Sequence, residues 1–312
     1  MENTVELSVI IPVTDRYDPI RDVHKEYKQG LETSSLMWEM IYVLDGPFPD
    51  VLSELTQLRE EGEKIRIITL ARRFGEATAL TVGFNHSSGN ILLTLPAYQQ
   101  VEASEIPKLL GALNEHDMVL ARRHPRIDSR LNRLRSRIFN TLLKFDRDFP
   151  IHDAGCNVRV FKRCVADEIH IYGDLHTFLP LMAHRQGFKI TELSVRQSHR
   201  DRLRRSYPPT KYFTKLLDIL AIFFLTKFTK KPLRFFGLAG ATTLMLGLVA
   251  TLYIVIERLF FDVALANRPA LLFSSLLIVL GIQIFAIGLI GEIIIFTHAR
   301  QLREYTVERI IN

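Results

Sequence analysis

The chain of 312 residues is poor in the features that mark several large protein classes. Its two cysteines, Cys156 and Cys164, form no CxxC pair, so we expect two ordinary thiols without a disulfide. The sequence contains neither a Walker A motif nor a GxGxxG, which argues against P-loop NTPases and dinucleotide-binding enzymes. It also lacks a GxSxG elbow and an HExxH motif, and its ten histidines are scattered, so a zinc site has no support.

Two long segments near the C-terminus contain no charged residue, Phe235–Ile256 and Pro269–Gly291. A helix needs about 20 apolar residues to cross the hydrocarbon core of a bilayer, so each segment is long enough to span it. A buried core helix is the other interpretation, but two such segments close together favour membrane spans.

Between Lys211 and Phe228 an amphipathic stretch predicts an interfacial helix, with a third transmembrane helix as the alternative.

Basic residues flank the two predicted spans. They are Lys227, Lys230, Lys231 and Arg234 before the first span, and His298, Arg300 and Arg303 after the second. By the positive-inside rule both ends of the chain are then cytoplasmic and the loop Glu257–Arg268 is outside. The N-terminus has only a short apolar run and two glutamates, which predicts no signal peptide. The net charge of +6 is compatible with nucleic acid, anionic lipid or phosphate substrates, and the spans favour the last two.

Strands and helices alternate along the first part of the chain. The predicted strands are Glu6–Val13, Trp38–Leu44, Ile65–Leu70, Ile91–Leu95 and Asp117–Ala121. The predicted helices are 19–35, 50–60, Gly75–His86 and Ile106–Glu115. This order predicts an α/β domain with a mostly parallel, helix-covered sheet that binds ligands at the carboxyl ends of its strands. Those ends are Pro12–Arg16, Asp45–Pro47, Ala71–Phe74, Pro96–Gln100 and Arg122–Arg123.

Several segments resemble motifs of one enzyme family in the same order. SVIIPVTDR is similar to S-V-V-I-P-V-Y-N-E, VLDGPFPD to V-D-D-G-S-T-D, and LARRFGEATALTVGFNHSSGN to L-x-R-N-F-G-K-x-x-A-L-x-A-G-x-x-x-A-x-G-D. Further along, DAGCNVRVFKR resembles D-x-G-x-x-F-R-L-x-x-R, and GLIGEIIIF resembles G-L-I-G-E-Y-L-G-R. The chain is thereby identified as similar to family 2 (GT-A) glycosyltransferases of the polyprenyl-phosphate type, which include dolichol-phosphate mannose synthase and the bactoprenol glucosyltransferases.

One segment departs from that family. NILLTLPAYQQVEASEIP resembles the metal-binding loop T-M-D-A-D-L-Q-D-P-P-E-L-I-P, whose two aspartates hold a divalent cation. Here those positions are Pro96 and Tyr98, while Gln100 is kept. The resemblance makes Mg²⁺ or Mn²⁺ the family's cofactor, but the usual ligands are missing, and we name no cofactor and no metal ligand for this chain. Arginines that neutralise phosphate directly are the hypothesis that we prefer to a weakly held cation near Asp45, Gln100 and Glu102.

The resemblance implies a membrane enzyme that moves a sugar from a nucleotide-sugar donor to a polyprenyl phosphate on the cytoplasmic face of a bacterial inner membrane. The predicted partners are the donor, the lipid acceptor and membrane lipids, without nucleic acid; assembly into a homo-oligomer stays open. The predicted parts are a GT-A domain (1–208), an interfacial helix (209–232), a two-span hairpin (233–298) and a cytoplasmic tail (299–312).

The resemblance also assigns site residues. The catalytic candidates are Arg122, Arg137, Asp153 and Arg200. The candidates for binding the nucleotide sugar are Pro12, Thr14, Asp45, Arg73, Pro96, Tyr98 and Gln100. The candidates for binding the lipid phosphate are Arg123, Arg137, Arg200 and Arg202.

Each candidate also has a purely structural interpretation. Asp45 can be a turn residue, the arginines of 122–137 can lie against anionic lipid, and Asp153 can form a structural pair with Arg159.

Two alternative functions of the protein also remain open. The first is a catalytically degenerate member that binds nucleotide or lipid phosphate as a partner of another membrane enzyme. The second is a membrane-tethered RNA binder, which the lack of interleaved aromatic residues disfavours.

Overall fold

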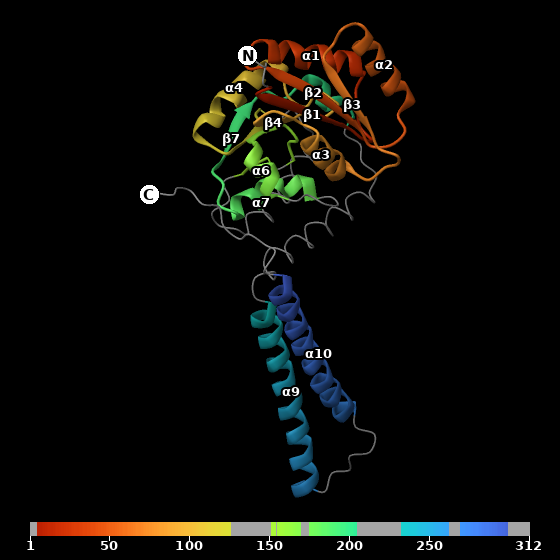
Figure 1. Ribbon diagram of the computed structural model, residues 1–312. Coiled ribbons are helices and arrows are strands. Elements are labelled where there is room, and N and C mark those ends of the chain that lie inside the picture. The colour runs from red at the N-terminus through yellow and green to blue at the C-terminus, as the bar shows by residue number, and fades with distance from the viewer. Residues whose placement is uncertain are drawn as a thin grey trace. The chain divides into compact units, whose positions relative to one another are not determined.

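The structure is a computed structural model, and it describes residues 5–125, 151–153, 155–169, 175–204, 232–261 and 269–298 (Figure 1). The chain divides into two units, and each is described by itself. The described residues up to Arg204 belong to the first unit, and the two long C-terminal helices belong to the second. The predicted interfacial helix and C-terminal tail lie outside the described residues.

A seven-stranded sheet organises the described part of the first unit, in the order β3-β2-β1-β4-β6-β5-β7. The strands are β1 (Leu7–Val13), β2 (Trp38–Leu44), β3 (Ile65–Thr69), β4 (Ile91–Thr94), β5 (Met118–Arg123), β6 (Arg159–Lys162) and β7 (Ile190–Val195). The first four strands pair in parallel, and β5 pairs in parallel with β7. Strand β6 runs antiparallel to both of its neighbours, β4 and β5.

All five predicted strands are present, and their ends differ from the prediction by no more than two residues. The expectation of a mostly parallel α/β sheet is therefore confirmed. The prediction did not include β6 and β7. Strand β6 is only four residues long, and half-buried residues fill most of β7, so neither carries a strong hydrophobic alternation.

Helices cover both faces of the sheet (Figure 1). One face carries α1 (Ile20–Glu32), α2 (Pro49–Glu60) and α4 (Ile106–Gly111), and the other carries α3 (Glu76–Asn85), α6 (Arg163–Glu168) and α7 (Leu179–Arg185). Short 3₁₀ helices complete the unit at Ala103–Glu105 (η1), Ala112–Glu115 (η2), Leu175–Phe178 (η3) and His199–Arg204 (η4). Apolar residues that recur on one side of α1 explain its orientation, because this stripe packs into the main core.

The strand order defines where a ligand site is expected. From β1 the chain continues to β2 and β3 on one side, while β4 lies on the other side of β1. The loops that follow β1 and β4 therefore diverge at a topological switch point. In open α/β sheets, the crevice outside the carboxyl ends of such strands is where ligands bind.

The second unit pairs two long helices, α9 (Pro232–Phe261) and α10 (Pro269–His298). Both are long and apolar enough to cross a membrane, and most of their large apolar side chains are exposed. The helices approach closely, since a Cβ on Gly240 would lie 2.6 Å from the main-chain nitrogen of Phe285. Glu292 of α10 accepts a hydrogen bond from the Leu233 N–H at 3.3 Å, so this acid caps the first turn of α9.

The contact between α3 and the sheet gives a first testable prediction. A methyl group on Gly83 would overlap with Cγ2 of the buried Ile10, so Gly83→Ala should destabilise the protein by about 1–3 kcal/mol. Gly111→Ala is the matched control, because nothing lies within 4 Å of its added Cβ and alanine favours a helix. Denaturant unfolding of the purified protein, followed by the fluorescence of the single tryptophan Trp38, measures both. Equal midpoints for the two variants would contradict this packing.

Candidate active site

The loop after β1 and the loop after β4 meet across the switch point. Pro12 is buried near the end of β1, and Thr14 and Arg16 follow it in half-buried positions. The guanidinium carbon of Arg16 lies 3.6 Å from the centre of the Tyr98 ring, so the two loops are joined by a cation–π contact. Tyr98 was among the site residues predicted from the sequence, whereas Arg16 was not.

Hydrogen bonds with α1 and with the segment before β6 fix the loop after β4. The Tyr27 hydroxyl of α1 donates to the main-chain oxygens of Pro96 and Tyr98, at 2.9 and 3.0 Å. Gln100 is buried, and its Oε1 accepts from the Asn157 N–H at 2.8 Å and from the Cys156 thiol at 3.5 Å. Burial raises the pKa of Cys156 to about 11, so this thiol stays protonated and remains a donor. Gln100 therefore joins the β4 loop to the segment before β6.

Asp45, at the end of β2, holds a third loop. Its carboxylate accepts from the Phe74 N–H at 2.7 Å and from the Gly75 N–H at 2.9 Å, just before α3 begins. Two amide donors satisfy both oxygens of a carboxylate that is 5% exposed. Asp45 therefore positions the β3–α3 loop, which borders the carboxyl edge of the sheet.

Behind these loops lies a buried network of four charged residues. The Arg123 guanidinium donates to both carboxylate oxygens of Asp153 at 2.8 Å and to Asp201 at 3.2 Å. Asp201 also accepts from Arg16 at 3.0 Å and from Gln197 at 2.7 Å. Burial alone would lower the pKa of Arg123, but the adjacent aspartates outweigh it and the pKa is raised well above its usual value. Arg123 therefore stays charged.

The expected pair of Asp153 with Arg159 is wrong, because Asp153 binds Arg123 instead. Arg159 donates to the main-chain oxygens of Cys156 and His176. Its side chain is 2% exposed, and burial lowers the pKa of its guanidinium to about 10. Arg159 is still charged at neutral pH, and it ties β6 to the segment that precedes α7.

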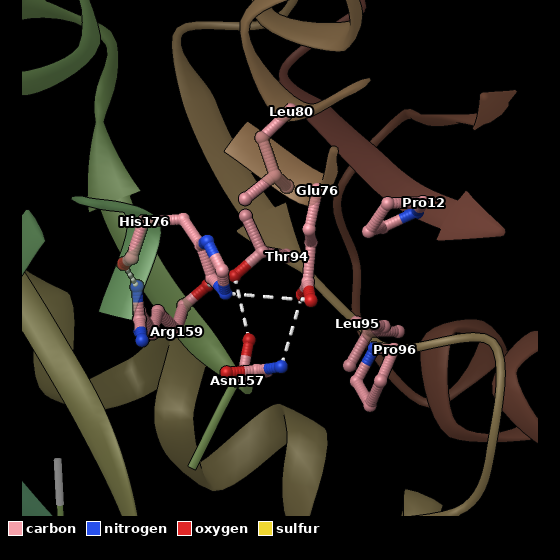
Figure 2. A pocket seen from close by; sticks show the side chains of 9 residues that line it. All are labelled: Pro12, Glu76, Leu80, Thr94, Leu95, Pro96, Asn157, Arg159 and His176. Atoms are coloured by element: carbon pink, nitrogen blue, oxygen red, sulfur yellow. Dashed lines mark hydrogen bonds and ion pairs between the residues drawn. The ribbon is translucent and has the colours of Figure 1, made fainter. Parts of the chain in front are cut away.

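A small pocket opens beside Pro12 and Pro96, between the ends of β1 and β4 (Figure 2). Glu76, Asn157 and His176 point toward one another inside it. One carboxylate oxygen of Glu76 accepts from Asn157 Nδ2 at 2.9 Å, and the other lies 3.4 Å from His176 Nε2. An acid, an amide and an imidazole in one pocket offer both donors and acceptors to a polar ligand. None of these three residues was predicted as a site residue from the sequence.

The remaining candidates are spread around the edge of the sheet. Arg73 is exposed and pairs with Asp15, and Arg200 is half exposed with Glu26 at 3.5 Å. Arg122 is half buried on β5, next to Arg123. Arg202 lies in η4, and Arg137 lies outside the described residues. The structure therefore brings together the candidates of the β1, β4 and β5 ends, and leaves Arg73 and Arg200 at the periphery.

The residues at the switch point do not fit a divalent cation, which takes several oxygen ligands at once. Pro96 offers no side-chain oxygen, and the ring of Tyr98 faces a guanidinium. The Asp45 carboxylate is taken by two amides, and Glu102 lies 3.6 Å from Arg196. Among the residues that the structure describes, no three His, Cys, Asp or Glu side chains are grouped to hold a metal.

A mixed α/β sheet with a polar site at its switch point is an arrangement that binds nucleotides and other ligands in many enzymes. The family model described as glycosyl transferase family 2 matches residues 8–169. The chain therefore belongs to glycosyl transferase family 2, and it is a glycosyltransferase with a GT-A domain.

Curated proteins match over almost the whole chain. An undecaprenyl-phosphate 4-deoxy-4-formamido-L-arabinose transferase from Klebsiella pneumoniae is 28% identical, with 98% of this chain and 94% of the relative covered. A protein of the same name from Proteus mirabilis is also 28% identical, with coverages of 99% and 95%.

Among solved structures, glucosyl-3-phosphoglycerate synthase from Mycobacterium tuberculosis in complex with Mg²⁺ and uridine diphosphate has a TM-score of 0.53 at 15% identity. The match covers 70% of this chain and 78% of that one. At this identity the likeness concerns the fold alone.

The buried network gives a second prediction. Asp153→Ala removes both oxygens that the Arg123 guanidinium contacts at 2.8 Å and leaves a buried charge with fewer partners. It should destabilise the protein by about 3–5 kcal/mol in denaturant unfolding. Glu61→Ala, which breaks the solvent-exposed pair with Arg21, is the control and should leave the midpoint nearly unchanged. If both variants unfold at the same denaturant concentration, the network is not a principal source of stability.

Proposed function

We propose that the chain transfers a sugar from a nucleotide-sugar donor to a polyprenyl phosphate at the cytoplasmic face of a bacterial membrane. The observation that carries this proposal is the match along 98% of the chain to transferases named for undecaprenyl phosphate. That match includes the two apolar helices, which suit an enzyme whose acceptor is held in the bilayer.

The proposed topology follows from the charges beside the spans. Lysines and arginines precede α9 and follow α10, which favours cytoplasmic ends and a multi-pass anchor with the GT-A domain inside. The proposed boundaries are a catalytic domain at 1–208, an interfacial helix at 209–232, a two-span hairpin at 233–298 and a tail at 299–312. A cytoplasmic domain has access to nucleotide sugars made in the cytoplasm.

The proposed reaction does not require a strong general base. The acceptor is a phosphate monoester with a second pKa of about 6, so it is largely ionised at neutral pH and already nucleophilic. The main demand is to stabilise the negative charge that develops on the leaving nucleoside diphosphate. Basic residues that remain charged, rather than a proton acceptor, are therefore the groups that this reaction needs most.

We assign the donor to the switch-point crevice. Its proposed direct contacts are Pro12, Thr14, Arg73, Pro96 and Tyr98, with Asp45 and Gln100 as supporting residues. The sugar would contact the mouth of the small pocket of Glu76, Asn157 and His176, whose donors and acceptors suit its hydroxyl groups. Asp45 and Gln100 act by holding loops, since their oxygens already accept main-chain hydrogen bonds.

We assign the acceptor phosphate to Arg122 of β5, to Arg200 and Arg202 of η4, and to Arg137, which lies outside the described residues. Planar guanidinium groups bind phosphate oxygens in pairs and keep their charge. Asp153 and Arg123 belong to the same region, but their side chains are 2% and 1% exposed. We propose that these two position the acceptor site through their ion pair.

Purified protein, incubated with polyprenyl phosphate and a panel of labelled UDP-, GDP-, ADP- and dTDP-sugars, tests this function. At least one donor should give a labelled product that extracts with the lipid. The matched control is the polyprenol alcohol, which lacks the phosphate nucleophile and should give no product. Nucleotide binding without lipid-linked product from any donor would instead support the degenerate, non-catalytic partner.

A further inference from the structure

The side chain that crosses the switch point is Arg16. It comes from the loop after β1, and the Tyr98 ring on which it lies comes from the loop after β4. These are the two loops whose divergence creates the ligand crevice. A fixed positive charge therefore stands where the fold places its ligand.

The side chain of Arg16 is more exposed than the other side chains of its ion-pair network. The side chains of Arg123, Asp153 and Asp201 are between 0% and 2% exposed, whereas that of Arg16 is 16% exposed. The four charges cancel in pairs, so the network is stable when buried, and Arg16 is its member at the surface of the crevice. Asp201 holds the Arg16 guanidinium from behind at 3.0 Å.

The loop that carries the Tyr98 ring beneath Arg16 is also held in place by hydrogen bonds. The Tyr27 hydroxyl donates to the main-chain oxygens on both sides of Ala97, which fixes the turn that carries Tyr98. Burial raises the pKa of Tyr27 well above its usual value, so this hydroxyl remains a donor. An arginine stacked on a fixed ring and paired from behind loses little freedom when it binds a ligand.

In these two loops, the differences between this chain and the family pattern all remove negative charge. The family pattern S-V-V-I-P-V-Y-N-E has an acid where this chain has Arg16, and the pattern T-M-D-A-D has acids where this chain has Pro96 and Tyr98. Each of the three replacements makes the crevice less negative. The positions that would hold a cation have been lost together with the gain of a guanidinium that faces them.

We propose that Arg16 takes the place of a divalent cation and binds the diphosphate of the nucleotide donor. This assignment rests on the proposed glycosyl transfer. In that step the bond between the anomeric carbon and the diphosphate oxygen breaks, and its electron pair stays on the nucleoside diphosphate. The acceptor phosphate oxygen supplies the pair for the new bond, and Arg16 keeps all its protons while its N–H groups stabilise the leaving diphosphate.

Other basic residues suit this role less well. Arg123 is 1% exposed, and two aspartates surround it. Arg73 is 64% exposed at the outer rim, where exposed charges are screened by solvent. Of the arginines that the structure describes near the crevice, Arg16 combines a fixed position with a side chain that is 16% exposed, while its Nε and Nη1 atoms are buried beside the crevice.

Binding of nucleoside diphosphate to the full-length protein in EDTA tests the assignment. Wild type is titrated calorimetrically with UDP, GDP, ADP and dTDP, and the tightest of these is kept as the probe. Arg16→Ala should weaken its binding by about 10-fold to 100-fold, the effect of a lost hydrogen bond to a charged group. The corresponding nucleoside, without phosphates, should bind both proteins equally.

Arg66→Ala is the matched control, because Arg66 is an ion-paired arginine near the opposite, amino end of the strands. It should leave binding of the probe unchanged. Arg16→Lys keeps the charge without the planar fork and should bind with intermediate affinity. Tyr98→Ala keeps both Arg16 and Asp201, and should weaken binding by about threefold or more even if Arg16→Ala fails to fold.

Three outcomes would overturn the assignment. They are wild-type affinity in Arg16→Ala, equal losses in the lysine and alanine variants, and wild-type binding that requires Mg²⁺ or Mn²⁺. The transfer assay separates this proposal from the function on which it rests. If no donor gives a lipid product but the Arg16 variants still bind the diphosphate weakly, the transfer function fails and the binding site stands. If Arg16→Ala transfers sugar at the wild-type rate in EDTA, the assignment fails and the transferase stands.

Discussion

The ion pairs of the buried Arg123 guanidinium with Asp153 and Asp201 hold the candidate site together. The guanidinium joins the end of β5, the segment before β6 and the helix η4, and through Asp201 it reaches Arg16 after β1. Removing one partner of a buried pair costs several kcal/mol, because an uncompensated charge stays behind. The same ion pairs therefore stabilise the fold and hold the charge that lines the crevice.

Much of the fold could be predicted from the sequence. Apolar runs such as Leu7–Val13 and Trp38–Leu44 are wholly or mostly buried, and turn residues or prolines follow them, which identifies strands of a parallel sheet. Strands β6 and β7 could not be predicted in this way. Their stability comes from pairing with β4 and β5, and the antiparallel direction of β6 leaves no mark on its four residues.

The site was predictable only where family motifs cover it. The position of Tyr98 in the loop after β4 was read correctly from the motif, but its partner Arg16 lies far away in the sequence. The acid at the end of the first family motif, replaced here by Arg16, was the signal available in the sequence. Asp201 and the pocket of Glu76, Asn157 and His176 depend on tertiary contacts that no local pattern encodes.

In our proposal, this family 2 enzyme neutralises the leaving diphosphate with the fixed Arg16, at a place whose side chains do not suit a metal. The most direct measurement is the initial rate of sugar transfer by the wild-type protein, in excess EDTA and again after Mg²⁺ or Mn²⁺ is added in excess over the chelator. Because Arg16 supplies the positive charge, we expect the same rate in both conditions. A rate that vanishes in EDTA and returns with the cation would show that a metal, and not Arg16, neutralises the diphosphate.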